Sequence, residues 1–147
     1  MESIYQHPTP IPFGFPDVTS SIISGVVFIA LVSLIKEPYR QRMMAMMLAV
    51  AGGVYINNGF GQYEMLAAIV VGIVAFYGSK SYKYIGIGWV FHTALDIAHH
   101  IHGYPLISTA ALSSLGCAVF DVVIAIWFFT GAPSIYSFFI SRLKPNS

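Results

Sequence analysis

The sequence predicts an all-α integral membrane protein, a bundle of about five transmembrane helices. The first observation is composition: 56% of the residues are hydrophobic, the mean hydropathy is +0.72 and only 9% are charged, which is unlike a soluble globule of this length. The second observation is that five apolar stretches follow one another along the chain. The third is that all lysines and arginines fall on one side when these stretches are laid across a bilayer.

Residues 1–17 form a lead-in with four prolines, Pro8, Pro10, Pro12 and Pro16. It has no basic n-region, so we do not expect a cleavable signal peptide. Its composition favours an extended segment rather than a helix.

Five stretches approach the roughly 20 apolar residues that a helix needs to cross the hydrocarbon core. We expect segments at about 18–35, 43–58, 64–78 and 84–102, and a fifth that begins between Ser108 and Gly116 and ends near Thr130. Side chains that can cap the first segment are Asp17, Thr19 and Ser20. Several segments are short, so tilt or a thin bilayer has to make up the difference. The transmembrane domain is therefore expected at 18–130.

The basic residues give the orientation. They lie between the first two segments, between the third and fourth, and after the fifth: Lys36, Arg40, Arg42, Lys80, Lys83, Arg142 and Lys144. The positive-inside rule then predicts an outside N-terminus and a cytoplasmic C-terminus. An even number of spans would break this agreement, which favours five. The expected location is a multi-pass membrane protein, in the inner membrane if the source is bacterial.

Two smaller features complete the predicted bundle. Small residues at helical spacing predict close helix contacts in the second and third segments, at Ala45, Ala49, Gly53, Ala68 and Gly72. After a glycine and proline stop, residues 131–147 predict a short amphipathic piece in the cytoplasmic interface.

The stretch "HTALDIAHHIHG" places four histidines and an aspartate in a very apolar chain. At about 100° per residue, Asp96 and His99 fall about 40° and −20° from His92, so these three line one helix face. His100 and His102 diverge to either side. An ionised aspartate facing lipid costs several kcal/mol, so Asp96 is expected to point into the bundle.

Other segments bring polar groups to the same, outer, leaflet. Asp121 in the fifth segment can face the histidine stripe, while Glu64, Asn57 and Asn58 lie at the outer ends of their segments. Four of five segments thus contribute carboxylate, amide or imidazole groups at one depth. Intramembrane ionisable residues mark functional sites by default.

Imidazole and carboxylate together suit zinc, iron, manganese or copper. An i, i+4 pair, His92 with Asp96 or Asp96 with His100, can hold one ion, whereas His92 and His99 are too far apart. A mononuclear site then needs Asp121 or Glu64 as well, and a binuclear one uses most of the stripe. The predicted metal ligands are His92, Asp96, His99, His100 and Asp121, with Glu64, Asn57 and Asn58 as possible additions.

Structural roles remain open for the same residues. Asp96 and Asp121 can share a proton or bond to His92 and so fix helix register only. Glu64 can simply favour the helix dipole, and Asn57 and Asn58 suit a turn or cap. The single cysteine, Cys117, is interpreted as a small core residue.

Several classes of protein are excluded. A net charge of +1 without a basic run argues against nucleic acid as a partner. Membrane desaturases need about eight histidine ligands from several boxes, and this chain has five histidines. A bis-histidine haem needs ligands on different helices. No GxSxG, P-loop or HExxH motif occurs.

The remaining functions belong to three classes, and no reaction is identified. The cluster can hold an ion that activates water against a lipid or another hydrophobic substrate. Alternatively, the chain is an accessory subunit of a larger membrane assembly, or it moves protons or ions through Asp96, Asp121 and His92. The expected partners are the bilayer and either other membrane subunits or further copies of this chain.

Four stretches together, "SLIKEPYRQR", "GIGWVFHTALDIAHHIHGYP", "SSLGCAVFDVVIAIWF" and "GAPS", resemble the small polytopic membrane proteins of domain of unknown function 6010. The resemblance runs from the first segment to Ser134. It implies a shared residue set and no activity. The set is Glu37, Pro38, Arg40, Glu64, Trp89, His92, Asp96, His99, His100, Ser114, Gly116, Cys117, Asp121 and Pro133.

Overall fold

The structure, a computed structural model, describes residues 13–56, 59–104, 107, 110 and 112–137. These residues form an all-α fold, as the sequence predicts. Its named helices are α1 (Phe15–Val32), α2 (Tyr39–Gly52), α3 (Gln62–Gly78), α4 (Tyr82–Ile101) and α5 (Ser113–Phe129).

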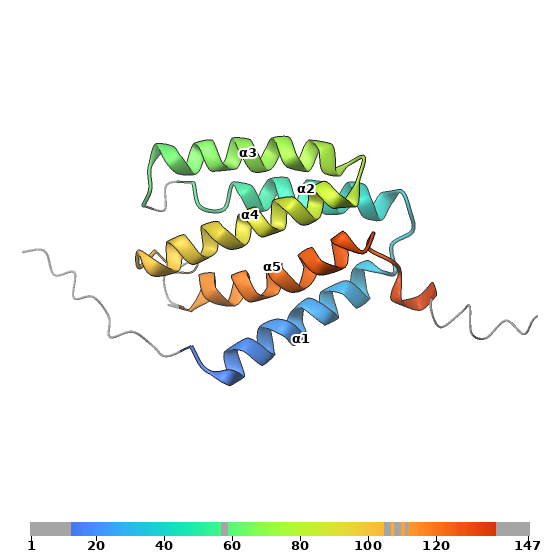
Figure 1. Cartoon of the computed structure of the whole chain (residues 1–147), viewed down its shortest axis with the longest axis horizontal. Coiled ribbons are helices and arrows are strands. Elements are labelled where there is room, and N and C mark those ends of the chain that lie inside the picture. The colour runs from blue at the N-terminus through green and yellow to red at the C-terminus, as the bar shows by residue number, and fades with distance from the viewer. Residues whose placement is uncertain (1–12, 57–58, 105–106, 108–109, 111, 138–147) are drawn as a thin grey trace, which may run out of the picture.

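Successive helices run in opposite directions, and α4 and α5 lie in the middle of the bundle (Figure 1). Helix α1 packs on α5, and the α2–α3 pair packs on α4. The α1–α2 connection, the α3–α4 connection and the end of α5 meet at one end of the bundle. There, Ser134 Oγ donates to the Ser33 carbonyl at 3.0 Å and Gln41 Nε2 to the Gly78 carbonyl at 2.9 Å.

We call this the basic end, because the lysines and arginines among the described residues gather there. Arg40 is the buried one: it donates to Glu37 Oε1 and, at 3.1 Å, to the Tyr82 hydroxyl. Arg142 and Lys144 lie outside the described residues.

The first four helices begin earlier than expected, and the differences are largest for α1 and α2. Helix α1 starts at Phe15 because the Gly14 N–H donates to Asp17 Oδ2 at 2.9 Å, with Pro16 in the first turn. Asp17 is thus the capping side chain, whereas Thr19 bonds to carbonyls within the helix.

Helix α2 covers 39–52 instead of the expected 43–58. It follows Pro38, whose ring fixes φ, and it ends at the pair Gly52 and Gly53, where glycine removes helix propensity. The consequence is that Tyr55 lies on a turn beyond the helix and its side chain is directed into the bundle, where it is buried. Asn57 and Asn58 lie outside the described residues, and so does most of 131–147, whose described part becomes helical at 135–137.

Glycines on α4 allow its neighbours to come close. A Cβ at Gly88 would overlap the buried side chain of Leu48 on α2, and a Cβ at Gly86 would touch the Phe129 ring at 3.0 Å. Around these contacts the core is filled by large apolar side chains, including Met44, Leu48, Ile85, Ile124 and Phe128. The close α2–α4 approach sets how near α2 comes to the polar residues of α4.

We expect Gly88→Ala to lower the free energy of unfolding by about 1–3 kcal/mol, because the new Cβ would overlap the fully buried Leu48 side chain, which must shift within the core. The matched control is Gly72→Ala on α3, where a Cβ meets nothing within 4 Å. That change replaces glycine by the best helix former, so it should be neutral or add up to about 1 kcal/mol. Thermal unfolding of the two variants in the same detergent checks the difference.

One helix of the described residues, α1, is long and apolar enough to cross a membrane, with 18 residues and a mean hydropathy of 1.8. Helices α3 and α5 are apolar but have 17 residues each. The structure thus supports one span by length and composition. Five spans and their orientation stay predictions.

A candidate metal centre

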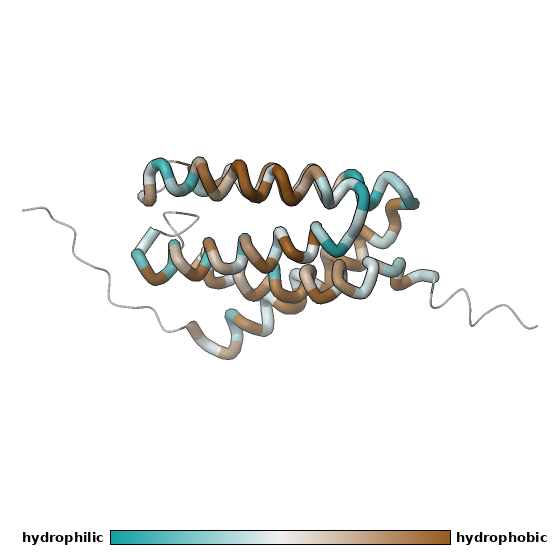
Figure 2. Tube along the Cα trace, turned by 45° about the horizontal axis from the view of Figure 1, so that its top comes forward, coloured by the Kyte–Doolittle hydropathy of each residue, from teal (hydrophilic) through white to brown (hydrophobic). Residues whose placement is uncertain are grey.

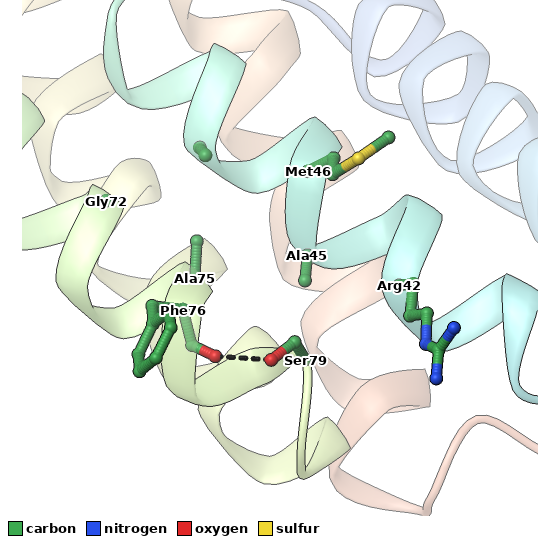
Figure 3. A pocket seen from close by; sticks show the side chains of 8 residues that line it. Arg42, Ala45, Met46, Gly72, Ala75, Phe76 and Ser79 are labelled. Atoms are coloured by element: carbon green, nitrogen blue, oxygen red, sulfur yellow. Dashed lines mark hydrogen bonds between the residues drawn. The ribbon is translucent and has the colours of Figure 1, made fainter.

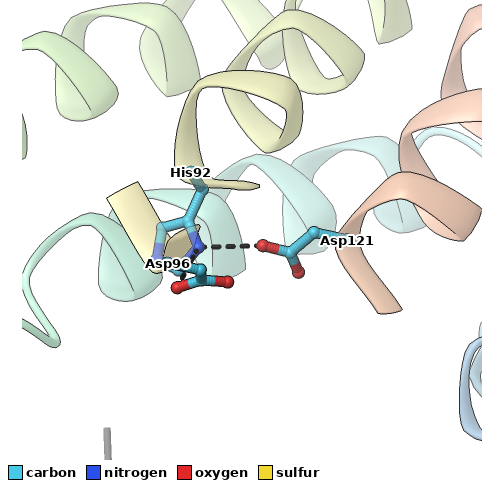
Figure 4. A group of neighbouring side chains, drawn as sticks. All are labelled: His92, Asp96 and Asp121. Atoms are coloured by element: carbon cyan, nitrogen blue, oxygen red, sulfur yellow. Dashed lines mark hydrogen bonds and ion pairs between the residues drawn. The ribbon is translucent and has the colours of Figure 1, made fainter. Parts of the chain in front are cut away.

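Three of the predicted ligands come together between α4 and α5. His92 Nδ1 lies 2.9 Å from Asp121 Oδ2 and 3.5 Å from Asp96 Oδ1 (Figure 4). One ligand atom from each residue lies within 4.8 Å of the other two. All three side chains are buried, with exposed fractions of 5% for His92, 0% for Asp96 and 2% for Asp121.

The positions of the three side chains follow from their places on α4 and α5. His92 and Asp96 are one turn apart on the face of α4 that packs against α5. Helix α5 begins at Ser113, which places Asp121 two turns inside the bundle, across from His92. The tight contact of Gly88 with α2 brings the Ala51 carbonyl to the other edge of the His92 ring.

Both nitrogens of His92 face oxygen atoms. Nδ1 faces Asp121 and Asp96, and Nε2 lies 3.0 Å from the Ala51 carbonyl oxygen. A carbonyl only accepts, so Nε2 carries a hydrogen and donates it. A neutral imidazole then has a lone pair on Nδ1, and a lone pair aimed at two carboxylates is favourable only if a proton or a cation lies between them.

Asp96 is held from one side. The Tyr55 hydroxyl donates to Asp96 Oδ1 at 2.6 Å and lies 3.1 Å from Ser114 Oγ. The second oxygen, Oδ2, is buried and has no hydrogen-bond partner among the described residues. Leaving a buried acceptor unsatisfied costs about 1–3 kcal/mol, so Oδ2 marks a position where a positive or donating group would be stabilised.

A second polar pair lies nearer the end of α4. His99 Nε2 lies 3.2 Å from Glu64 Oε1 on α3, and His99 Nδ1 lies 2.9 Å from the Leu95 carbonyl. Both side chains are buried. The Tyr55 ring separates this pair from the His92 cluster, because it stacks on His99 with ring centroids 3.7 Å apart while its hydroxyl reaches Asp96.

The structure therefore divides the predicted ligand set. His92, Asp96 and Asp121 form one group, while His99 pairs with Glu64 instead. His100 is half-buried and is not part of the group, and His102, at the end of α4, is exposed. Asn57 and Asn58 cannot be placed, since they lie outside the described residues.

Tyr55 is the residue that sequence reasoning missed. It contacts both polar groups, yet in "GGVYINNG" it is one of nine tyrosines. Tyr55 falls inside the expected helix 43–58, and nothing in the sequence indicates which face of that helix is buried. The glycine pair Gly52 and Gly53, where α2 ends early, was the local signal that could have indicated this turn, but the direction of the Tyr55 side chain toward Asp96 depends on tertiary packing.

Comparison with known families gives a match. The family of unknown function DUF6010 matches residues 17–134, which include α2 to α5 and all of α1 except its first two residues. No curated protein and no solved structure matches the chain.

Proposed function

The chain belongs to the family of unknown function DUF6010, and we propose that it is a membrane-embedded helical bundle that binds a divalent transition metal at His92, Asp96 and Asp121. The observation that carries the proposal is the convergence of an imidazole nitrogen and two carboxylates in a fully buried position, one carboxylate oxygen of which has no partner among the described residues.

The surface supports the membrane part of the proposal. Large apolar side chains are exposed along α1 and α3, including Ile23, Leu31, Met65, Ile69 and Phe76. In Figure 2 the uppermost helix, α3, is hydrophobic along its middle and hydrophilic toward its ends. Carboxylates and imidazoles are buried inside. Apolar residues outside and ionisable residues inside are typical of a bundle in lipid and unfavourable in water. By the positive-inside rule, the lysines and arginines at the basic end favour an orientation in which this end faces the cytoplasm.

The distances support the metal part. Zinc ligands lie about 2.0–2.2 Å from the ion in tetrahedral geometry, so ligand atoms are about 3.4 Å apart. Two of the three separations, 2.9 and 3.5 Å from His92 Nδ1, fall close to this value, and all three ligand atoms lie within 4.8 Å of one another. Metal-bound histidines usually donate their other N–H to a carbonyl or carboxylate, which is the role that Ala51 fills. Nitrogen and oxygen donors without sulfur suit zinc, manganese and iron, and copper also binds imidazole.

The number of ligands supports a finer proposal, that the ion activates water for a reaction on a hydrophobic substrate. Structural zinc sites have four protein ligands, whereas catalytic sites have three and keep one position for water or substrate. Three side chains converge here. Ion translocation is less well supported, because the level toward the basic end is filled by Leu48, Ile85 and Ile124, which are fully buried and apolar.

The direct test is elemental analysis of the full chain purified from membranes without chelator. We expect about one equivalent of a transition metal per chain and recovery in the membrane fraction after an alkaline carbonate wash. Metal at background level in folded protein would contradict the metal site. Recovery in the soluble fraction would contradict the membrane location.

Tyr55→Phe should weaken metal binding by about 10–100-fold, because it removes the hydroxyl that orients Asp96 without removing a ligand. The Trp89 ring lies 5.6 Å from the His92 ring, centroid to centroid, so quenching of its fluorescence by Cu²⁺ reports binding. The titration is made in a Trp127→Phe background, which leaves Trp89 as the one tryptophan of the chain. An unchanged midpoint would show that Tyr55 does not position the ligand.

A further inference from the structure

A groove of about 330 Å³ lies between α2 and α3, away from the metal centre. Its walls are mostly apolar and small, and its polar lining residues are Arg42 and Ser79. Small-molecule sites in proteins begin at about 300 Å³. The residues that matter for its shape are Ala45, Ala49, Gly72 and Phe76.

The polar residues are not spread along the groove. Arg42 is in the first turn of α2 and Ser79 is the C-cap residue of α3, so both lie at the basic end, as Figure 3 shows. Ala49 is seven residues further along α2, about 10 Å toward the middle of the bundle. The groove is thus amphipathic along its length, charged at one end and apolar beyond it.

A second cation, Lys80, follows Ser79 in the chain and so lies at the basic end, next to the groove rather than among its lining residues. Lys80 Nζ lies over the Phe76 ring, 5.5 Å from its centroid. Neither Arg42 nor Lys80 has a carboxylate within salt-bridge distance among the residues that the structure describes, in contrast to Arg40, which pairs with Glu37. The Ser79 hydroxyl donates its hydrogen to the Phe76 carbonyl at 2.6 Å, so it is not available as a donor to an anion. The positive charge at this end therefore comes from Arg42 and Lys80.

The middle of the groove is open because of a glycine. A Cβ built at Gly72 meets no atom within 4 Å, while Met46 and Phe76, with exposed fractions of 66% and 64%, stand beside it. In lipid, the walls of an empty hollow lose dispersion contacts. An acyl chain that fills the hollow restores these contacts.

From this charge pattern we propose that the α2–α3 groove binds one anionic phospholipid, with its phosphate at Arg42 and Lys80 and an acyl chain along Ala45, Ala49 and Gly72. The inference rests on the proposed membrane location and is independent of the metal centre. An anionic headgroup neutralises two cations that have no carboxylate partner in the part of the chain that the structure describes, and each cation near an anionic lipid surface contributes attraction. The apolar groove excludes a free phosphate as the main ligand, because it offers a phosphate no contact beyond the mouth.

The test uses the purified full chain in dodecyl maltoside micelles, to which phosphatidylglycerol or phosphatidylcholine with the same acyl chains is added. We expect phosphatidylglycerol to raise the unfolding midpoint by several degrees and to remain bound, at about one molecule per chain, in native mass spectrometry. Phosphatidylcholine should do neither.

Two variants locate the effect. Arg42→Gln removes the charge and Gly72→Leu fills the groove without a backbone clash, and both should abolish the difference between the lipids. The matched controls are Lys83→Gln, which makes the same charge change at an exposed position of α4, and Ala94→Leu, which adds side-chain volume at another exposed position of α4. Both controls should respond as the wild type does.

Equal stabilisation by the two lipids, or a full response in Arg42→Gln and Gly72→Leu, would overturn the proposal. Inorganic phosphate that reproduces the shift would also overturn it. Failure of the membrane location is recognised separately, since the chain would then be recovered in the soluble fraction. Failure of the metal site would appear as a low metal content with the lipid response intact.

Discussion

Asp121→Asn should reduce metal affinity by more than about 100-fold and leave the purified chain without its ion. Loss of an orienting partner typically costs 10–100-fold, and Asp121 supplies a ligand oxygen itself, 2.9 Å from His92 Nδ1. The asparagine keeps the size of the side chain and one oxygen but removes the charge. The fold should therefore persist, which circular dichroism in detergent checks alongside elemental analysis.

The control for this variant is His100→Gln. His100 belongs to the same helix and to the same histidine-rich stretch, yet it is half-buried and lies outside the group formed by His92, Asp96 and Asp121. We expect its metal content to equal that of the wild type. Loss of metal in His100→Gln with retention in Asp121→Asn would place the ion elsewhere along α4.

His99→Leu should lower the free energy of unfolding by about 3–5 kcal/mol and leave the metal content unchanged. The substitution leaves the Glu64 carboxylate buried, with an exposed fraction of 4%, and without the imidazole now 3.2 Å away. Removing one partner of a buried pair costs this much because the other stays desolvated with fewer partners, even though the Phe60 N–H still donates to Glu64 Oε1 at 3.0 Å. Denaturant unfolding in detergent measures the loss.

Two comparisons make this prediction specific. His102→Leu makes the same change three residues further along, where the side chain is exposed and bonds to the Ala98 carbonyl, and it should alter stability by no more than about 0.5 kcal/mol. The double variant Glu64→Leu with His99→Leu should recover much of the loss, because both polar partners are then replaced by apolar groups. A double variant as unstable as the sum of the two single variants would show that Glu64 and His99 do not act as a pair.

The division of the histidine stripe shows what periodicity can and cannot predict. The i, i+4 spacing alone places His92 and Asp96 on one face, and the structure confirms that they adjoin Asp121. Periodicity also places His99 on that face, which is correct, since it is buried. Its partner was not predictable, because the choice between Asp121 and Glu64 depends on how α3 and α5 pack against α4.

The helix class could be predicted from the sequence, whereas the end of α2 was not. The all-α class follows from composition and from long apolar stretches, and it is confirmed in the described residues. The end of α2 at Gly52 was predicted six residues too late, since an apolar stretch continues through Val54 and Ile56 even though the helix does not. That difference is what hid Tyr55, whose contacts with Asp96 and His99 are made by tertiary structure rather than by sequence spacing.

The central claim, an ion held by His92, Asp96 and Asp121, is tested most directly by X-ray absorption spectroscopy of the metal in the purified chain. The account predicts a first shell of nitrogen and oxygen atoms at about 2.0–2.2 Å, with outer-shell scattering from one imidazole that disappears in His92→Ala. Sulfur at about 2.3 Å, which only Cys117 or a methionine could supply, would contradict it, and so would scattering from two or more imidazoles.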